Sequence, residues 1–94
     1  MQFEARNFRI MKKNTLLGFV EIETPSGLVI NDVALHEKNG KHWLSMPARA
    51  YEKNGEKSWI PYVKFKNRET TDKFQAAALP AVVSALKEAE GGHD

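Results

Sequence analysis

Aromatic and basic side chains are interleaved through the middle of the chain. Rings of Trp and Tyr stack on unpaired bases, and Lys or Arg contacts phosphates, so these residue types on one surface suit single-stranded nucleic acid. The window from Lys38 to Arg68 contains eight basic and two acidic residues, whereas residues 69–94 contain two basic and five acidic ones. The candidate nucleic-acid-binding residues are Trp43, Arg49, Tyr51, Lys53, Tyr62, Lys64, Lys66 and Arg68.

Two plainer explanations of this pattern stay open. Lysines on exposed strands prevent pairing with other sheets. A cross-strand pair of Trp43 and Tyr62 would shield both rings without any ligand.

The remaining polar residues form no catalytic or metal-binding motif. The chain has no cysteine, which excludes a thiol nucleophile, a disulfide and a cysteine-ligated zinc site. His36 and His42 flank the Asn39-Gly40 turn on opposite faces of a predicted hairpin, where they cannot share a metal. Asp32 interrupts an apolar stretch, and a structural hydrogen-bonding role is favoured over a catalytic one. No glycine-rich phosphate loop, serine–histidine–acid spacing or EF-hand is present, so we expect no enzyme, no metal and no cofactor.

Turn signals predict the elements that must position the candidate residues. Pro25-Ser26-Gly27 suits a three-residue hairpin loop, and Asn39-Gly40 and Asn54-Gly55 suit two-residue type I′ turns. These turns predict an antiparallel β-meander of about five strands. The strands are expected near residues 2–11, 16–24, 28–37, 42–52 and 57–66.

The segment after the strands is rich in helix formers. Thr70 to Glu90 predicts a C-terminal helix with Asn67 or Thr70 as its N-cap. Pro80 lacks an N–H group and should kink or split this helix. The fold class is therefore α+β, with one domain over residues 1–90 and a disordered tail over 91–94.

The predicted turns also fix which residues share a face. A two-residue loop at Asn54-Gly55 places Trp43 opposite Lys66, and the loop at Asn39-Gly40 places Leu35 opposite Leu44. Both registers agree on one apolar face, which the helix should cover through Phe74, Ala78 and part of the set Leu79, Val82, Val83 and Leu86. The expected apolar face comprises Val29, Val33, Leu35, Leu44, Met46, Trp59, Val63 and Phe65. The opposite, open face would gather Trp43, Arg49, Tyr51, Tyr62, Lys64 and Lys66.

The second and third strands are apolar on both faces in this scheme. Their open face would carry Leu16, Val20, Ile22, Leu28 and Ile30, which are too apolar for water. A second subunit is the simplest cover for a small domain. We therefore expect a homodimer whose interface contains Val20, Ile22, Leu28 and Ile30.

The chain resembles the SpoVG (septation regulator) family of small bacterial regulators over roughly residues 3–80. The resemblance is carried by the stretch from Leu28 to Val33, Gly40, the segment Ser45-Met46-Pro47-Ala48-Arg49, the turn Asn54-Gly55-Glu56, and Arg68 leading into the helix near Phe74. It implies a dimer of strands and helix that binds DNA or RNA in the cytoplasm. Members commonly place two basic residues after the Met-Pro-small segment, whereas here Arg49 is followed by Ala50.

The layout of a sheet followed by one helix is also similar to that of the transcriptional positive coactivator group of single-stranded-DNA-binding dimers. This second likeness is one of topology alone.

Two functional hypotheses follow. The first is a homodimeric regulator that holds single-stranded or locally opened DNA, or RNA, on the basic and aromatic face, with duplex DNA as a further possible partner. The second is a protein-interaction module whose basic face binds an acidic partner protein. No apolar run approaches the roughly 20 residues of a membrane span, so we expect no membrane partner and a cytoplasmic location.

Overall fold

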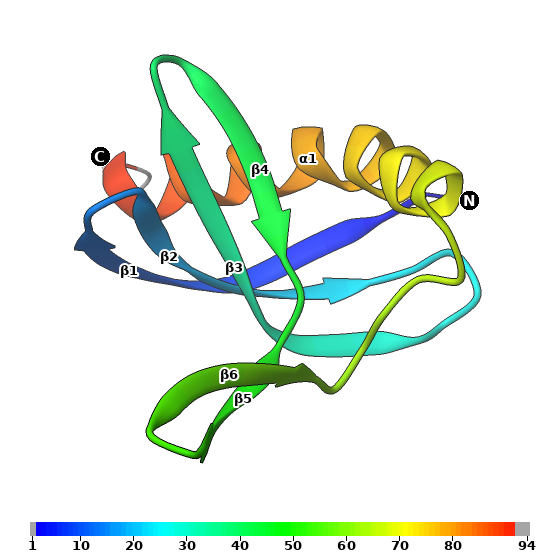
Figure 1. The fold of residues 1–94 in the computed structure, drawn as a ribbon. Helices are drawn as coiled ribbons and strands as arrows, with labels where there is room; N and C mark the ends of the chain where they lie inside the picture. The colour runs from blue at the N-terminus through cyan, green and yellow to red at the C-terminus, as the bar shows by residue number, and fades with distance from the viewer. Residues whose placement is uncertain (1, 92–94) are drawn as a thin grey trace.

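The computed structural model describes residues 2–91 as a curved antiparallel sheet covered on one face by a single long helix (Figure 1). The sheet has the order β1-β2-β3-β4, and a separate two-stranded hairpin pairs β5 with β6. The predicted α+β class is therefore confirmed. The elements are β1 (Glu4–Lys13), β2 (Leu16–Glu23), β3 (Val29–Lys38), β4 (Lys41–Ser45), β5 (Ala48–Lys53), β6 (Glu56–Pro61) and α1 (Arg68–Gly91).

The predicted turns and registers are confirmed where the strands pair. Asn39 and Gly40 both have positive φ, at 55° and 82°, as do Asn54 and Gly55, at 55° and 79°. These values are those that a type I′ turn requires at its two central positions. Leu35 pairs with Leu44 across the first of these turns, and Tyr51 pairs with Ser58 across the second.

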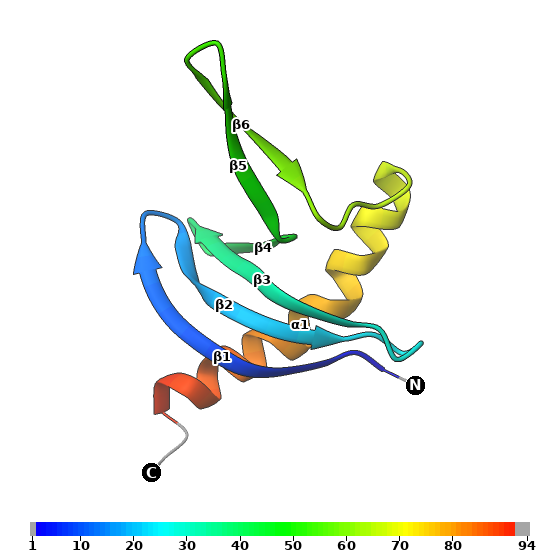
Figure 2. The same cartoon turned by 90° about the horizontal axis from the view of Figure 1, so that it is seen from below.

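The predicted fourth strand is wrong, because it breaks in two at Met46-Pro47. Proline cannot donate to a strand ladder and tends to end regular pairing. β4 therefore ends at Ser45, and β5 starts a hairpin that projects away from the sheet and helix (Figure 2). β6 likewise ends at Pro61, so the predicted strand pairing of Trp43 with Lys66 does not form.

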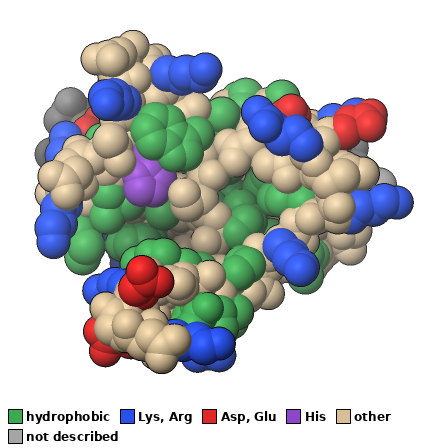
Figure 3. Space-filling view, in the orientation of Figure 1, with side chains coloured by type: hydrophobic (Ala, Val, Ile, Leu, Met, Phe, Trp, Pro, Cys, Tyr) green, Lys and Arg blue, Asp and Glu red, His purple; other side chains and the backbone are tan. Residues whose placement is uncertain are grey.

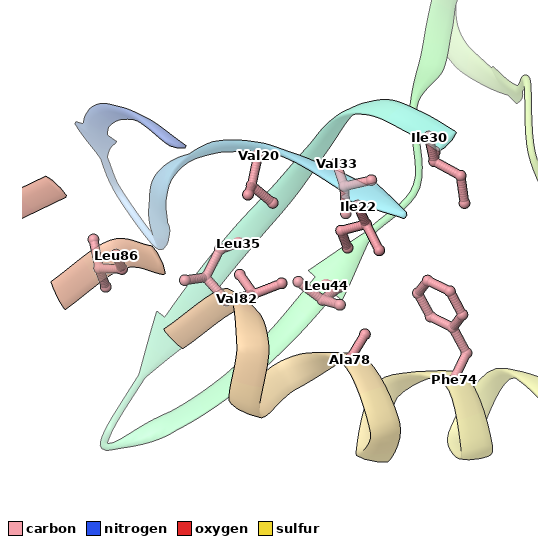
Figure 4. Close-up of a cluster of buried hydrophobic side chains, with 10 residues drawn as sticks. All are labelled: Val20, Ile22, Ile30, Val33, Leu35, Leu44, Phe74, Ala78, Val82 and Leu86. Carbon is pink, nitrogen blue, oxygen red and sulfur yellow. The ribbon is translucent and has the colours of Figure 1, made fainter. Parts of the chain in front are cut away.

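The core lies between the sheet and α1, and it contains most of the residues predicted for a dimer interface. Val20, Ile22 and Ile30 are 1%, 0% and 5% exposed within a single chain. Their side chains lie on the sheet face that meets α1 (Figure 4). The prediction that they face outward is therefore wrong, and only Leu28, at 57% exposed, remains on the surface.

A β-bulge in β3 explains this error. Val20 pairs with Val33 and Ile22 with Ile30, so one residue of β2 lies opposite the two residues Asn31 and Asp32. Asp32 adopts the left-handed region, with φ of 59°. An extra residue exchanges the two faces of a strand, so Ile30 and Val33 both point to the core despite their odd spacing.

The same bulge corrects the predicted apolar face. Val33, Leu35 and Leu44 are buried as expected, but Val29 is 44% exposed. Trp59 is 64% exposed, because the hairpin that carries it leaves the sheet. The other predicted members, Met46, Val63 and Phe65, are partly buried against the core.

The helix begins and packs as the sequence indicates. The Asn67 side-chain oxygen accepts a hydrogen bond from the Thr70 N–H at 2.8 Å, which identifies Asn67 as the N-cap. One face of the helix is buried in the core through Phe74, Ala78, Val82 and Leu86.

The predicted division of this helix at Pro80 is wrong, because α1 runs through it as one helix. Pro80 deprives the Ala76 carbonyl of its usual helical partner. Both residues are exposed, so water can bond the freed carbonyl. A bend at Pro80 stays a prediction. Gly91, the first residue of the predicted tail over 91–94, is the last residue of α1, and residues 92–94 lie outside the described residues.

The side chain of Gln75 on α1 closes the free edge of the sheet. Its Oε1 atom accepts a hydrogen bond from the Leu44 N–H at 2.9 Å, and its Nε2 atom donates to the Leu44 carbonyl at 2.8 Å. β4 is the last strand of the sheet, so these main-chain groups have no strand partner. The amide thus takes the place of a further strand at the buried Leu44.

Candidate nucleic-acid interface

Most of the predicted binding residues lie on the hairpin and on the linker that follows it. Arg49, Tyr51 and Lys53 alternate along β5, so their side chains share one face of the hairpin. Exposed and half-buried residues also alternate after Pro61. Lys64 and Lys66 face outward, and Val63 and Phe65 pack toward the core. We refer to the predicted residues of these segments, with Arg68 at the start of α1, as the cationic strip. The cationic strip comprises Arg49, Tyr51, Lys53, Tyr62, Lys64, Lys66 and Arg68.

Trp43 lies apart from the strip on β4 of the four-stranded sheet. Its ring stacks on the His36 ring with centroids 5.4 Å apart and planes within 7°. The open face that the sequence predicted for Trp43, Arg49, Tyr51, Tyr62, Lys64 and Lys66 together is therefore divided between the sheet and the hairpin. The alternative explanation, in which Trp43 and Tyr62 shield each other, is not supported, because the ring that stacks on Trp43 is that of His36.

Arg6 of β1 is neutralised by ion pairs with three carboxylates. Arg6 contacts Glu21 at 2.8 Å, Glu23 at 2.7 Å and Glu4 at 3.1 Å. The hydrogen bonds that Arg6 donates to Glu21 and Glu23 raise the pKa of Arg6, and the bond from Arg6 lowers the pKa of Glu21. Arg6 is held by carboxylates of its own chain, so it is poorly placed to bind phosphate.

The basic residues of the cationic strip, unlike Arg6, are not held by several carboxylates. Among residues 2–91, Arg49 and the three lysines of the strip form no ion pair with another side chain. Arg68 has a single contact, to Asp72 at 3.4 Å, in which both side chains are largely exposed. Pairs of this kind contribute little stability, so Arg68 is also open to exchange for another anion.

Charged and hydrophobic side chains occupy different parts of one face of the molecule. In the face shown in Figure 3, Lys and Arg side chains lie around the perimeter and hydrophobic side chains lie nearer the middle. The cations surround a hydrophobic interior.

A hollow of about 970 Å³ separates the base of the hairpin from the sheet face that α1 leaves open. We call it the hairpin groove. Its larger hydrophobic lining residues are Leu16, Phe19, Met46, Pro47, Trp59 and Tyr62. Sequence reasoning missed this groove, although the Met46-Pro47 break and the polar pair Asn31-Asp32 in an apolar strand were both visible as signals.

The bulge supplies polar groups at the same groove. Asn31 and Asp32 line it, and Asp32 forms an ion pair with Arg9 of β1. The Arg9 guanidinium lies over the Phe19 ring, 5.6 Å from its centroid. The structural role predicted for Asp32 is thus supported, with Arg9 as its partner rather than a main-chain N–H.

His36 lines the groove, and its ring is held in orientation by its neighbours. Its Nδ1 atom lies 3.0 Å from the Thr15 hydroxyl, and burial lowers its pKa below the ordinary value of 6.5. Its stacking on Trp43 fixes the plane of the ring. The other histidine of the turn, His42, lies on β4. Residues 2–91 contain no group of three or more side chains that could hold a metal ion.

Comparison with known proteins adds no assignment, because no family model, curated protein or solved structure matches the chain. Over the described residues, α1 and the rest of the fold include no helix with the length and apolar character needed to cross a membrane.

Proposed function

We propose that this protein binds single-stranded or locally opened nucleic acid along the cationic strip. The observation that carries the proposal is the contrast between Arg6, held by three carboxylates, and Arg49, Lys64 and Lys66, which form no ion pair among residues 2–91. Unpaired cations on an exposed segment attract a polyanion and release its counterions on binding.

Exposed rings on the same segments favour single strands over duplex. Tyr62 is 65% exposed and Tyr51 is 37% exposed, so both rings are accessible to a base. A base can stack on a ring only when it is unpaired. Duplex DNA and folded RNA would use the cations without the rings, and they remain alternatives within the same proposal.

Salt dependence of oligonucleotide binding tests this proposal. Lys64→Ala or Lys66→Ala should weaken binding and reduce the slope of log affinity against log salt by about 0.7 for each phosphate that the variant no longer neutralises. Tyr62→Ala should leave the slope unchanged and cost roughly 1 to 3 kcal/mol of stacking.

Lys38→Ala is the matched control, because Lys38 is an exposed lysine at the β3–β4 turn and lies away from the strip. An equal effect of Lys38→Ala would show a diffuse field of charge and contradict a defined site. Binding by none of the proteins would refute the proposal.

The second candidate is an interaction module for an acidic partner protein, which the same unpaired cations would support. An acidic polypeptide such as polyglutamate distinguishes the two. Tight binding of polyglutamate with no binding of oligonucleotides would favour the second candidate. In either case we propose a binding role in the cytoplasm, without catalysis.

A homodimer remains part of the proposal, now based on Leu28 rather than on Val20, Ile22 and Ile30. Leu28 and Val29 are adjacent and are 57% and 44% exposed at the β2–β3 turn. Sedimentation should give a mass near twice 10.6 kDa, and Leu28→Glu should shift it toward the monomer. Met11→Glu is the control, since Met11 is also 57% exposed. A monomeric parent protein at micromolar concentration would contradict the dimer.

A further inference from the structure

The hairpin groove differs in chemistry from the strip beside it. Of the described residues that line it, Arg9 alone has a Lys or Arg side chain, and that side chain is paired with Asp32. A phosphate entering the groove would meet the Asp32 carboxylate and no unpaired cation. The groove therefore suits an uncharged group rather than the backbone of a nucleic acid.

Rings form much of the wall of the groove. Trp59 is 64% exposed and Tyr62 is 65% exposed, although both are large and apolar. Phe19 and His36 face them from the open side of the sheet. Flat aromatic ligands stack on such side chains with a favourable energy and no requirement for charge.

Three polar side chains that line the groove can hydrogen-bond to the edge of a nucleobase. The amide of Asn31 can donate and accept, the hydroxyl of Ser45 can do both, and the Asp32 carboxylate accepts. Bases carry both donors and acceptors on their edges, and single-stranded recognition reads those edges after the base has left its stack.

The groove and the strip are also continuous along the chain. Ala48 lines the groove, and the next residue, Arg49, points to the opposite face of the hairpin. Tyr62 lines the groove, and Lys64 follows two residues later on the exposed side of the linker. Lys64 is therefore the cation that links the two, because a strand with a phosphate on Lys64 has a base within reach of Tyr62, two residues away, whereas Arg49 serves the far face of the hairpin.

We infer that the hairpin groove is a nucleobase site, which receives one or more unstacked bases of the strand whose phosphates contact the cationic strip. This inference rests on the proposed function and adds to it a division of roles between cations outside and rings inside. A peptide and a second copy of the chain are the rival occupants.

Filling the groove tests the inference without removing a cation. Ser45→Phe places a ring in the groove, and Ser84→Phe, at an exposed position on α1, is the matched control. The probes are an oligothymidylate of about eight nucleotides and an abasic strand of the same length. The parent protein and Ser84→Phe should prefer the strand with bases by about tenfold or more.

Ser45→Phe should bind both strands alike, with the affinity for the abasic strand and the salt slope unchanged. Retention of the full base preference by folded Ser45→Phe would overturn the inference. If the proposed function itself is wrong, the result is different, because the parent protein would then bind neither strand.

Fluorescence provides a measurement with an intact groove. The chain has two tryptophans, so Trp43→Phe leaves Trp59 as the single reporter. Saturating oligothymidylate should protect Trp59 from quenching by acrylamide, and the abasic strand should not. Three results would overturn the inference: equal access with and without oligothymidylate, protection by polyglutamate alone, or protection that rises with protein concentration before any strand is added.

Discussion

Replacing Gln75 should destabilise the protein by more than its position on a helix surface suggests. The Gln75 amide makes hydrogen bonds of 2.9 Å and 2.8 Å to the N–H and carbonyl of Leu44. Gln75→Met keeps the length of the side chain but leaves both main-chain groups without a partner at the edge of the sheet. Leu44 itself is 4% exposed, so water has little access to these groups.

The size of the effect follows from these two bonds. A buried group that loses its partner costs about 1 to 3 kcal/mol, and each of these bonds is only partly buried. We therefore take about 1 kcal/mol for each, and about 2 kcal/mol for Gln75→Met. For a domain of this size that corresponds to a fall of roughly 10 °C in Tm.

Equilibrium unfolding in urea, followed by circular dichroism, measures this change. The midpoint should fall without a change in the dependence on urea, because the surface exposed on unfolding is nearly the same. Lys87→Met is the control, since Lys87 is an exposed residue of the same helix. A Gln75→Met protein as stable as Lys87→Met would refute the argument.

Gln75→Glu tests the donor separately. A carboxylate accepts from the Leu44 N–H but cannot donate to the Leu44 carbonyl, and the two oxygens repel. A protonated carboxyl group can do both. The destabilisation relative to the parent protein should therefore shrink as the pH falls toward about 4.

Two further predictions concern the sheet. Gly18→Ala should lower the free energy of unfolding by about 2 kcal/mol or more, because a Cβ atom would lie against the Arg9 carbonyl oxygen and 2.6 Å from the Phe8 ring. Gly91→Ala is the control in the same urea assay and should be nearly neutral, since Gly91 has open space around it. The lowered pKa of His36 means that the unfolded chain takes up its proton first as the pH falls, so stability should decline from about pH 6.5 downward. His36→Gln should remove that part of the decline in unfolding experiments between about pH 7.5 and 5.5, and an unchanged profile would contradict the assignment.

Local conformational preferences made the turns and registers predictable. Asn and Gly tolerate positive φ, so Asn39-Gly40 and Asn54-Gly55 mark their turns before any tertiary contact is known. A two-residue turn fixes which residues pair across it, which is why the pairs around both turns are confirmed. The N-cap at Asn67 was predictable for the same reason, since its side chain bonds within its own turn.

The faces of the sheet were less predictable, because side-chain alternation carries through a strand only when every residue pairs. The bulge at Asn31-Asp32 reverses the faces on one side of it, so Ile30 is in the core and Val29 is on the surface. Two polar residues in an apolar strand were the available signal. Their effect depends on how β2 pairs with β3 and on where Arg9 of β1 meets Asp32.

The candidate site divides in the same way. The sequence by itself determined that Arg49 lies on a hairpin, because strand and turn positions follow from short-range pattern, but it placed Lys64 and Lys66 in a strand that the structure ends at Pro61. Only the tertiary structure decided that Arg6 is neutralised, that Trp43 belongs with His36, and that a groove lies under the hairpin. The direction in which the hairpin leaves the sheet at Met46-Pro47 is set by packing between distant segments, and residue order along one strand does not encode it.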